Sequence, residues 1–288
     1  MEKLHLSINI NAPTEKVWFT MLYDATYRIW AEVFYKGSYF EGNWDQGSEM
    51  KFLAKDEQGN LGGMLGKIKE NKLFESISIE YIANIVNGVE DTTSDMAKLI
   101  LGAHENYTFK NNNDGTTELS IDMDLNAEMK AMLEPMWKTA LQKLKELAET
   151  KPDNVTIEAT IDAPMQLVWE TWTKPEHIVN WAFASDDWEA LSAENDLRKN
   201  GKFTTVMAAK DKSFQFPFGG VYTNVKENEL IEYILGDGRY AKITFTQTPE
   251  GVKVSENFEI EGSNPKEMQK AGWQAIMDNF KKYTLSKK

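Results

Sequence analysis

The stretch INAPTEKVW at residues 10–18 returns as IDAPMQLVW at residues 161–169. A tryptophan follows each stretch at the same distance, as Trp30 and as Trp181. Two more groups recur in the same order and spacing. Gly-Gly precedes Lys-Glu-Asn both at residues 62–71 and at residues 219–228. Thr-Phe precedes a glycine and a tryptophan both at residues 108–137 and at residues 244–273. A period this long is no solenoid repeat, so each copy should own a core. The chain is therefore a duplicated domain of roughly 140 residues.

Chain length supports the same division. The chain has 288 residues, 41% of them hydrophobic, which is ordinary for a globular protein of two domains. We expect a first domain over residues 1–150, with an insertion at about residues 86–103, and a second domain over residues 155–288. Ser94 should cap a short helix in the insertion. Long insertions often form lids or partner contacts, so this one predicts either a lid over the first domain or a strut against the second.

The charge balance narrows the possible partners. The formal net charge is −13, and an acidic surface repels phosphate backbones and anionic lipid headgroups. We therefore expect no nucleic-acid partner and no membrane partner. There is no cysteine, no apolar run long enough to span a bilayer, and no apolar block at the amino terminus of the kind that a signal peptide needs. These features predict a cytoplasmic protein without disulfides.

Hydrophobic periodicity predicts the order of elements in each copy. Apolar residues alternate over residues 4–10 and 155–161, which indicates an opening strand with one buried face. Several alternating stretches separated by turn residues follow, as in an antiparallel meander. Each copy closes with an apolar stripe at three-four spacing, over residues 129–147 and 268–283, which predicts a long helix. Pro135 inside the first stripe predicts a kink or a late helix start, and Pro265 predicts the start of the second helix.

These patterns carry a family resemblance. Asn11-Ala12-Pro13 and Asp162-Ala163-Pro164 head the two copies, and Gly272-Trp273 lies in the last helix. The chain resembles the START-like, helix-grip superfamily, also called the polyketide cyclase or birch-pollen-allergen type. Within it, the chain is similar to proteins related to the activator of the heat-shock 90 chaperone ATPase, most clearly through LRKNGKF at residues 197–203.

The resemblance implies an α+β fold of two tandem helix-grip domains. Each domain would be a curved antiparallel sheet wrapped around a long carboxy-terminal helix, with two short helices. In many members of the superfamily a cavity between sheet and helix takes an apolar ligand. Such a void is physically reasonable, because a bent sheet and one helix do not always fill the volume between them.

Two charged residues of the second copy fall among apolar neighbours. Glu256 alternates with Val254 and Phe258, and Arg239 shares the parity of Ala241. A buried charge is costly without a partner, so we expect Arg239 and Glu256 to meet each other or to anchor a ligand. The plainer interpretation is a structural ion pair, or exposure at the strand ends.

Aromatic residues also gather after the first helix of each copy and along the predicted strands, where they form either core or pocket wall. With the charged pair and one methionine they give the predicted ligand-binding residues: Trp30, Phe34, Tyr39, Phe52, Trp181, Phe203, Met207, Phe214, Phe216, Arg239, Glu256 and Trp273.

The sequence contains no clear catalytic constellation. His5, His104 and His177 are scattered, and neither a nucleophile elbow nor a zincin pair is present. We expect no metal site, no cofactor and no catalytic residue. The favoured function is binding of a small apolar or amphipathic molecule in one or both cavities, with the second pocket the more polar. The alternatives are a co-chaperone-like module that binds a protein partner, and a cyclase-type or hydrolase-type enzyme that uses Glu256 or an aspartate as its acid-base group.

Overall fold

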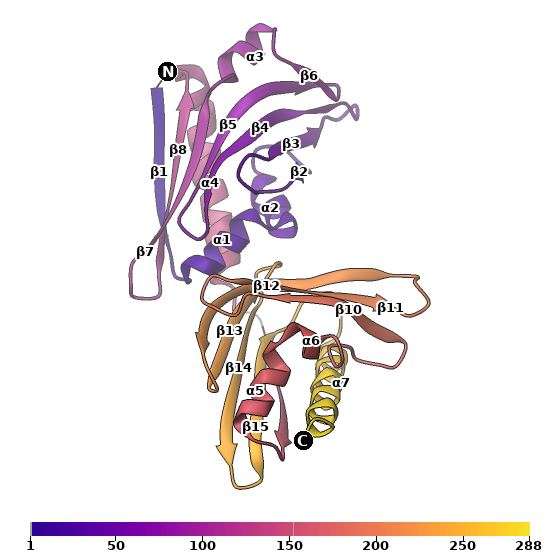
Figure 1. The fold of residues 1–288 in the computed structure, drawn as a ribbon. Helices are drawn as coiled ribbons and strands as arrows, with labels where there is room; N and C mark the ends of the chain where they lie inside the picture. The colour runs from indigo at the N-terminus through magenta and orange to yellow at the C-terminus, as the bar shows by residue number, and fades with distance from the viewer. Residues whose placement is uncertain (1, 152) are drawn as a thin grey trace. The chain divides into compact units, whose positions relative to one another are not determined.

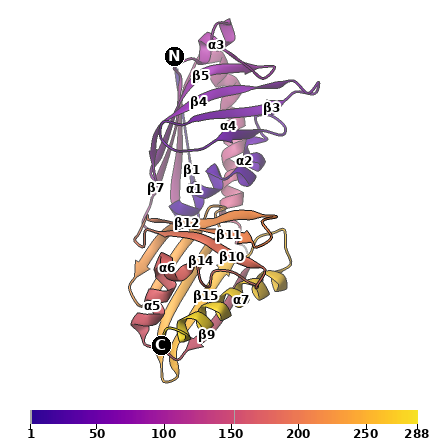
Figure 2. The ribbon, with the colours of Figure 1, turned by 45° about the vertical axis from the view of Figure 1, so that its right-hand side comes forward.

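Two copies of one architecture make up the protein. The computed structural model describes residues 2–151 and 153–288. Its contacts divide the chain into two compact units, residues 1–150 and 151–288. In each unit a curved antiparallel sheet holds a long closing helix in its concave side (Figures 1 and 2). The chain therefore has an α+β fold of two tandem helix-grip domains, as the resemblance implied.

The first unit contains eight strands and four helices within the described residues. They are β1 (Glu2–Ile10), α1 (Thr14–Leu22), α2 (Asp24–Ala31), β2 (Tyr39–Gly42), β3 (Glu49–Lys55), β4 (Leu61–Lys72), β5 (Ser76–Val86), β6 (Val89–Asp91), α3 (Asp95–Ile100), β7 (His104–Asn111), β8 (Thr117–Leu125) and α4 (Ala127–Glu149). The sheet order is β1-β8-β7-β5-β4-β3-β2, and β6 pairs with β5. The first strand therefore closes onto the last, and the strands between them form a meander.

The second unit repeats this plan without the insertion. Its elements are β9 (Asn154–Ile161), α5 (Met165–Thr173), α6 (Pro175–Ile178), β10 (Trp188–Asn195), β11 (Lys202–Ala209), β12 (Gln215–Lys226), β13 (Leu230–Leu235), β14 (Tyr240–Thr248), β15 (Gly251–Glu259) and α7 (Lys266–Leu285). The sheet order is β10-β11-β12-β13-β14-β15-β9. Both sheets share the order expected of one duplicated fold.

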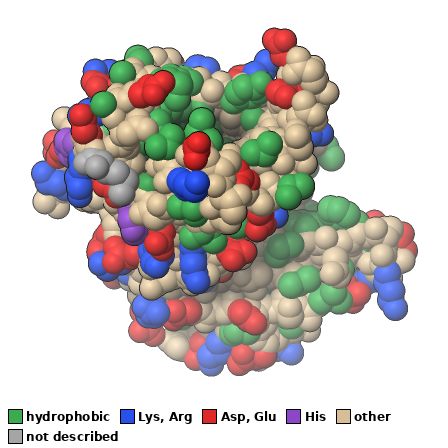
Figure 3. Space-filling view, turned by 90° about the horizontal axis from the view of Figure 1, so that it is seen from above, with side chains coloured by type: hydrophobic (Ala, Val, Ile, Leu, Met, Phe, Trp, Pro, Cys, Tyr) green, Lys and Arg blue, Asp and Glu red, His purple; other side chains and the backbone are tan. Residues whose placement is uncertain are grey.

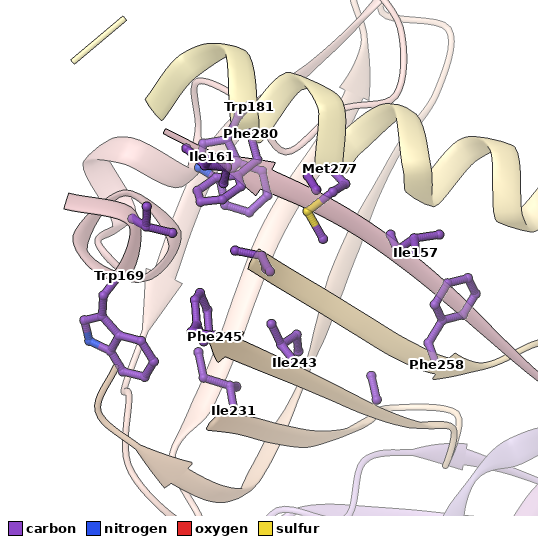
Figure 4. Packing of buried hydrophobic residues seen from close by; sticks show 14 of the residues in the cluster. Ile157, Ile161, Trp169, Trp181, Ile231, Ile243, Phe245, Phe258, Met277 and Phe280 are labelled. Carbon is purple, nitrogen blue, oxygen red and sulfur yellow. The ribbon is translucent and has the colours of Figure 1, made fainter. Parts of the chain in front are cut away.

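Alternating burial along the strands builds each core. Leu4 and Ile10 of β1 are buried, as are Ile157, Ala159 and Ile161 of β9, whereas the polar residues that alternate with them are exposed or partly exposed. In the second unit Met277 and Phe280 reach from α7 toward the sheet (Figure 4). Apolar burial of this kind is the main favourable term in folding.

The closing helices differ in detail from the predicted stripes. Helix α4 runs from Ala127 through Pro135, so a late helix start at the proline is wrong. In α7, Met268 is exposed, so its predicted place in the buried apolar stripe is wrong. Gln269 is buried instead: its amide donates to the carbonyls of Glu261 and Asn264, at 2.9 and 2.7 Å. The buried turn is thus polar because it ties the start of α7 to the preceding loop.

The insertion of the first unit is a small hairpin and one helix. Strand β6 folds back on β5, and α3 packs against β5 through Ala97 and Ile100. The backbone N–H of Ala97 donates to the Ser94 hydroxyl at 3.1 Å, which confirms the predicted cap. Val86 and Asn87 at the hairpin tip are the parts of this segment that reach the cavity described next.

Candidate functional site

Each unit encloses a cavity between its sheet and its closing helix. The cavity of the first unit measures about 500 Å³. Helices α2 and α4 line one side and strands β3, β4, β5 and β7 the other. This volume is within the usual range for a small-molecule site.

A buried carboxyl group lies in the wall of the first cavity. Glu105 of β7 alternates with the buried Tyr107 and Phe109, so its side chain points inward and is only 5% exposed. The Tyr81 hydroxyl donates to Oε2 of Glu105 at 2.8 Å, and the Tyr107 hydroxyl donates to Oε1. Burial raises the pKa of Glu105, while these two hydrogen bonds oppose the rise.

Aromatic rings form much of the wall around this carboxyl group. The ring centroid of Trp137 lies 4.9 Å from that of Phe34, 5.9 Å from that of Trp30 and 6.2 Å from that of Tyr107. The indole N–H of Trp30 donates to the Met21 carbonyl at 3.1 Å, which fixes the ring on helix α1. The wall is therefore apolar and held by its own contacts.

The cavity of the second unit is smaller, at about 360 Å³. Trp181 again anchors one side, because its indole N–H donates to the Thr171 carbonyl of α5 at 2.9 Å. Trp273 of α7 lines the cavity and stacks on Phe258, with ring centroids 4.1 Å apart. The two repeat-related tryptophan pairs thus occupy corresponding places in the two units.

Glu256 is the buried carboxyl group of the second cavity. It stands on β15 opposite Ile243 of β14 and Ile157 of β9, and it is 6% exposed. The Tyr233 hydroxyl donates to its Oε1 at 3.1 Å. Burial raises the pKa of Glu256 to about 7, and the tyrosine bond opposes part of that rise. The group can therefore take up or release a proton near neutral pH.

Arg239 lines the same cavity but forms its ion pair elsewhere. Its Nε donates to Oδ2 of Asp237 at 2.7 Å, within the turn between β13 and β14. Both side chains line one cavity, as strand parity predicted, but Arg239 pairs with Asp237 and not with Glu256. The ion pair agrees with the plainer interpretation, and a role of either residue as anchor for a ligand stays a prediction.

Most of the predicted ligand-binding residues line a cavity. In the first unit these are Trp30, Phe34 and Phe52. In the second unit they are Trp181, Phe203, Met207, Phe216, Arg239, Glu256 and Trp273. Two aromatic residues lie outside both cavities: Tyr39, whose ring lies under the Arg28 guanidinium at 5.1 Å, and Phe214, which is 60% exposed.

Both misplaced residues have a physical explanation. Phe40 packs against Tyr27 on the core side, and side chains alternate along a strand, so its neighbour Tyr39 points to the opposite face. Phe214 precedes β12 at the β11–β12 turn, where its ring lies near those of Phe216 and Trp188.

Sequence reasoning missed Glu105 and its two tyrosines. The alternation that points Glu256 inward is also present here, because Glu105 alternates with Tyr107 and Phe109 as Glu256 does with Val254 and Phe258.

No group of three or more potential metal ligands gathers within residues 2–151 and 153–288. Over the same residues, each helix is too short or too polar to cross a membrane.

Comparison with known proteins places the chain among relatives. The family model described as "Activator of Hsp90 ATPase homolog 1-like protein" matches residues 162–284. The AHSA1-like protein of Aeromonas hydrophila is 38% identical, over 47% of this chain and 94% of that chain, with a TM-score of 0.45. A solved protein of Cytophaga hutchinsonii is 48% identical, over 46% of this chain and 93% of that chain, with a TM-score of 0.42.

One solved structure spans both units. It is the di-domain ARO/CYC StfQ from the steffimycin biosynthetic pathway, which aligns over 99% of each chain at 13% identity and a TM-score of 0.39. A search of curated proteins found no match.

Proposed function

The chain belongs to the family of activator of Hsp90 ATPase homolog 1-like proteins, and from this premise we propose that each unit binds a small apolar or amphipathic molecule in its cavity. Folds of this START-like type commonly bind hydrophobic ligands. Apolar burial would supply the affinity: a guest that hides about 300 Å² of apolar surface gains roughly 7 kcal/mol before the entropic cost of association.

The observation that carries this proposal is the buried carboxyl group in each cavity. A carboxyl group in an apolar wall costs free energy that an aliphatic side chain would not. Glu105 and Glu256 each line open volume, and among the described residues the side-chain donors to them are tyrosine hydroxyls. The only base that lines either cavity in that part of the chain is Arg239, which is paired with Asp237. A ligand with one polar group would give such a carboxyl group a partner and would also fix the orientation of the guest.

Mass spectrometry of protein purified without denaturant tests the proposal. Released small molecules should accompany the wild-type chain and decrease when each cavity is filled, through Ala54→Trp in the first unit and Thr205→Trp in the second. Both positions line their cavities. Thr246→Trp, on an exposed position of β14, is the matched control. Absence of any released molecule, together with no uptake of added amphiphiles, would end the proposal.

The name of the matching family supports a second candidate function. Residues 162–284 match a family described as homologous to an activator of the Hsp90 ATPase, which favours a protein-interaction role for the second unit. The expected result is a changed ATPase rate of an Hsp90-type chaperone on addition of the chain. If Thr205→Trp changes that rate as the wild type does, the second cavity has no part in the interaction.

A further inference from the structure

The charged side chains that line the first cavity are all acidic among the described residues. Asp56 and Glu105 are its only charged lining residues among those the structure describes, and no lysine, arginine or histidine joins them. Asp56 is occupied in its own turn, where it accepts from the backbone N–H groups of Gln58 and Asn60. Glu105 is thus a buried acid without a basic partner in the wall. The second cavity differs, because Arg239 lines it together with Glu256.

Aromatic side chains line the cavity that contains this acid. The cavity is lined by Tyr27, Trp30, Phe34, Tyr35, Phe52, Tyr81, Tyr107 and Trp137. The negative face of an aromatic ring attracts a cation whose centre comes within about 6 Å of the ring centroid, and tryptophan does so best. Tyr107 connects the two features, because its hydroxyl donates to Glu105 and its ring contacts that of Trp137.

Glu105 retains acceptor capacity for a guest. A carboxylate offers about four lone-pair directions, and the hydroxyls of Tyr81 and Tyr107 use one on each oxygen. These neutral donors orient the group without cancelling its charge. A positive charge that enters the cavity would offset the cost of an ionised carboxylate there. The acidic chain, with its net charge of −13, attracts cations from solution.

We propose that the first cavity selects amphiphiles with a cationic nitrogen head group, with Glu105 as counter-ion and with Trp30, Trp137 and Tyr107 as the aromatic wall around the charge. The inference rests on the proposed function, since it names the class of ligand that the first unit takes. An anionic head group such as a fatty-acid carboxylate would meet two acids and no base, and is disfavoured.

Calorimetric titration of the full chain tests this selectivity with three probes that each contain one eight-carbon chain, each kept below its solubility limit and any critical micelle concentration. The probes are octyltrimethylammonium, 1-octanol and octanoate. The wild type should bind octyltrimethylammonium at least ~10-fold more tightly than octanol, and octanoate most weakly at this cavity. Glu105→Gln should abolish the preference, so that octyltrimethylammonium binds no more tightly than octanol. Glu256→Gln, the matched change in the second unit, should leave the preference intact.

Each contrary outcome has its own meaning. If none of the three probes binds, the proposed function itself fails. If octanol or octanoate binds as tightly as the cation, or if Glu105→Gln keeps the preference, ligand binding stands and the cationic class is wrong. Should Glu105→Gln not fold, Glu256→Gln still decides, because loss of the preference in that variant would move the site to the second cavity and overturn the inference.

Discussion

The two cavities both contain a buried carboxyl group, yet the group stands at different positions of the repeat. The repeated Thr-Phe pairs, Thr108-Phe109 and Thr244-Phe245, place Glu105 at the position of Ala241. In the strand register, Tyr107 of β7 lies opposite Ile121 of β8, and the equivalent Ile243 of β14 lies opposite Glu256 of β15. Glu256 therefore corresponds to Ile121 of the first unit. Duplication of one ancestral acid therefore does not explain the pair. A buried acid has been built separately into each unit, which favours a use for it in each.

The surroundings of the two acids also differ. Glu105 accepts from two tyrosine hydroxyls, and no base lines its cavity among the described residues. Glu256 accepts from one tyrosine and shares its cavity with Arg239. Two hydroxyl donors stabilise the ionised form of Glu105, which has no basic residue in its cavity wall among those described. One hydroxyl donor stabilises the ionised form of Glu256. These differences should appear in stability and titration. On the face that Figure 3 shows, acidic and basic side chains are interspersed.

The largest effect is expected from the paired tryptophans of the closing helices. Trp137 is buried and contacts three aromatic rings, so Trp137→Ala should lower the free energy of unfolding by about 3–5 kcal/mol. Trp273 is only half-buried beside its cavity, so Trp273→Ala should cost roughly 2 kcal/mol. Denaturant titration of both variants measures the difference. Equal losses of unfolding free energy would mean that the two tryptophans contribute equally to the packing of their helices.

The next effect is the pH dependence that Glu256 confers. Its pKa is raised to about 7 in the folded state, so the native chain holds this proton more tightly than the unfolded chain does. Its contribution to stability is present below the unfolded pKa and is lost as pH rises through about 7. The loss amounts to roughly 3 kcal/mol.

Comparison with Glu256→Gln isolates that contribution. The wild type should lose roughly 3 kcal/mol of unfolding free energy relative to Glu256→Gln between about pH 4 and pH 8. Thermal or denaturant unfolding across that range measures it. A constant difference between the two proteins would show that Glu256 does not titrate as a buried acid.

Removal of single tyrosine hydroxyls should give a smaller effect. Tyr107→Phe deletes one of two donors to Glu105, and Tyr233→Phe deletes the hydroxyl donor to Glu256. Each change should cost about 1 kcal/mol where the carboxyl group is ionised, and each should raise the pKa of that carboxyl group further. Carbon-13 NMR titration of the glutamates reports the shift, with Tyr35→Phe at an exposed tyrosine as control. An unchanged titration would mean that these hydroxyls do not stabilise the anions.

The smallest effect is expected from Arg239. Its ion pair with Asp237 is partly exposed, so Arg239→Gln should change stability by no more than about 1 kcal/mol. Arg28→Gln, which breaks the exposed pair with Asp24, is the matched control. The pKa of Glu256 should stay near its wild-type value in Arg239→Gln, because burial and Tyr233 set it. A clear rise in that pKa would restore Arg239 as the counter-ion of Glu256.

Periodic patterns predicted the fold well because they reflect which face is buried. The opening strands, the meander and the closing helices all followed from alternation or from three-four spacing. Identical short motifs of the two copies did not always occupy equivalent positions in the fold. The tripeptide Lys-Glu-Asn at residues 69–71 lies inside β4, whereas the same tripeptide at residues 226–228 begins at the end of β12 and continues into the β12–β13 turn. The equivalent turn of the first unit has its positive φ at Phe74, three residues later than the sequence match to Asn228 implies.

Side-chain partners were harder to predict than strands. Parity correctly directed both Glu256 and Arg239 to the cavity, but it carries no information on partners, and the guanidinium of Arg239 binds the nearby Asp237. The hydrogen-bond partners of Glu105 are only partly local in sequence. Its burial depends on Tyr81, which is distant in sequence and comes near only through the β5–β7 pairing. Contacts of that kind are set by the sheet rather than by local spacing.

A crystal structure of the chain purified without denaturant tests the central claim most directly. It should show non-protein density for an apolar or amphipathic molecule in at least one cavity, with its polar end at Glu105 or Glu256. Cavities that are collapsed onto their own side chains, or that hold only water after exposure to amphiphiles, would contradict the account.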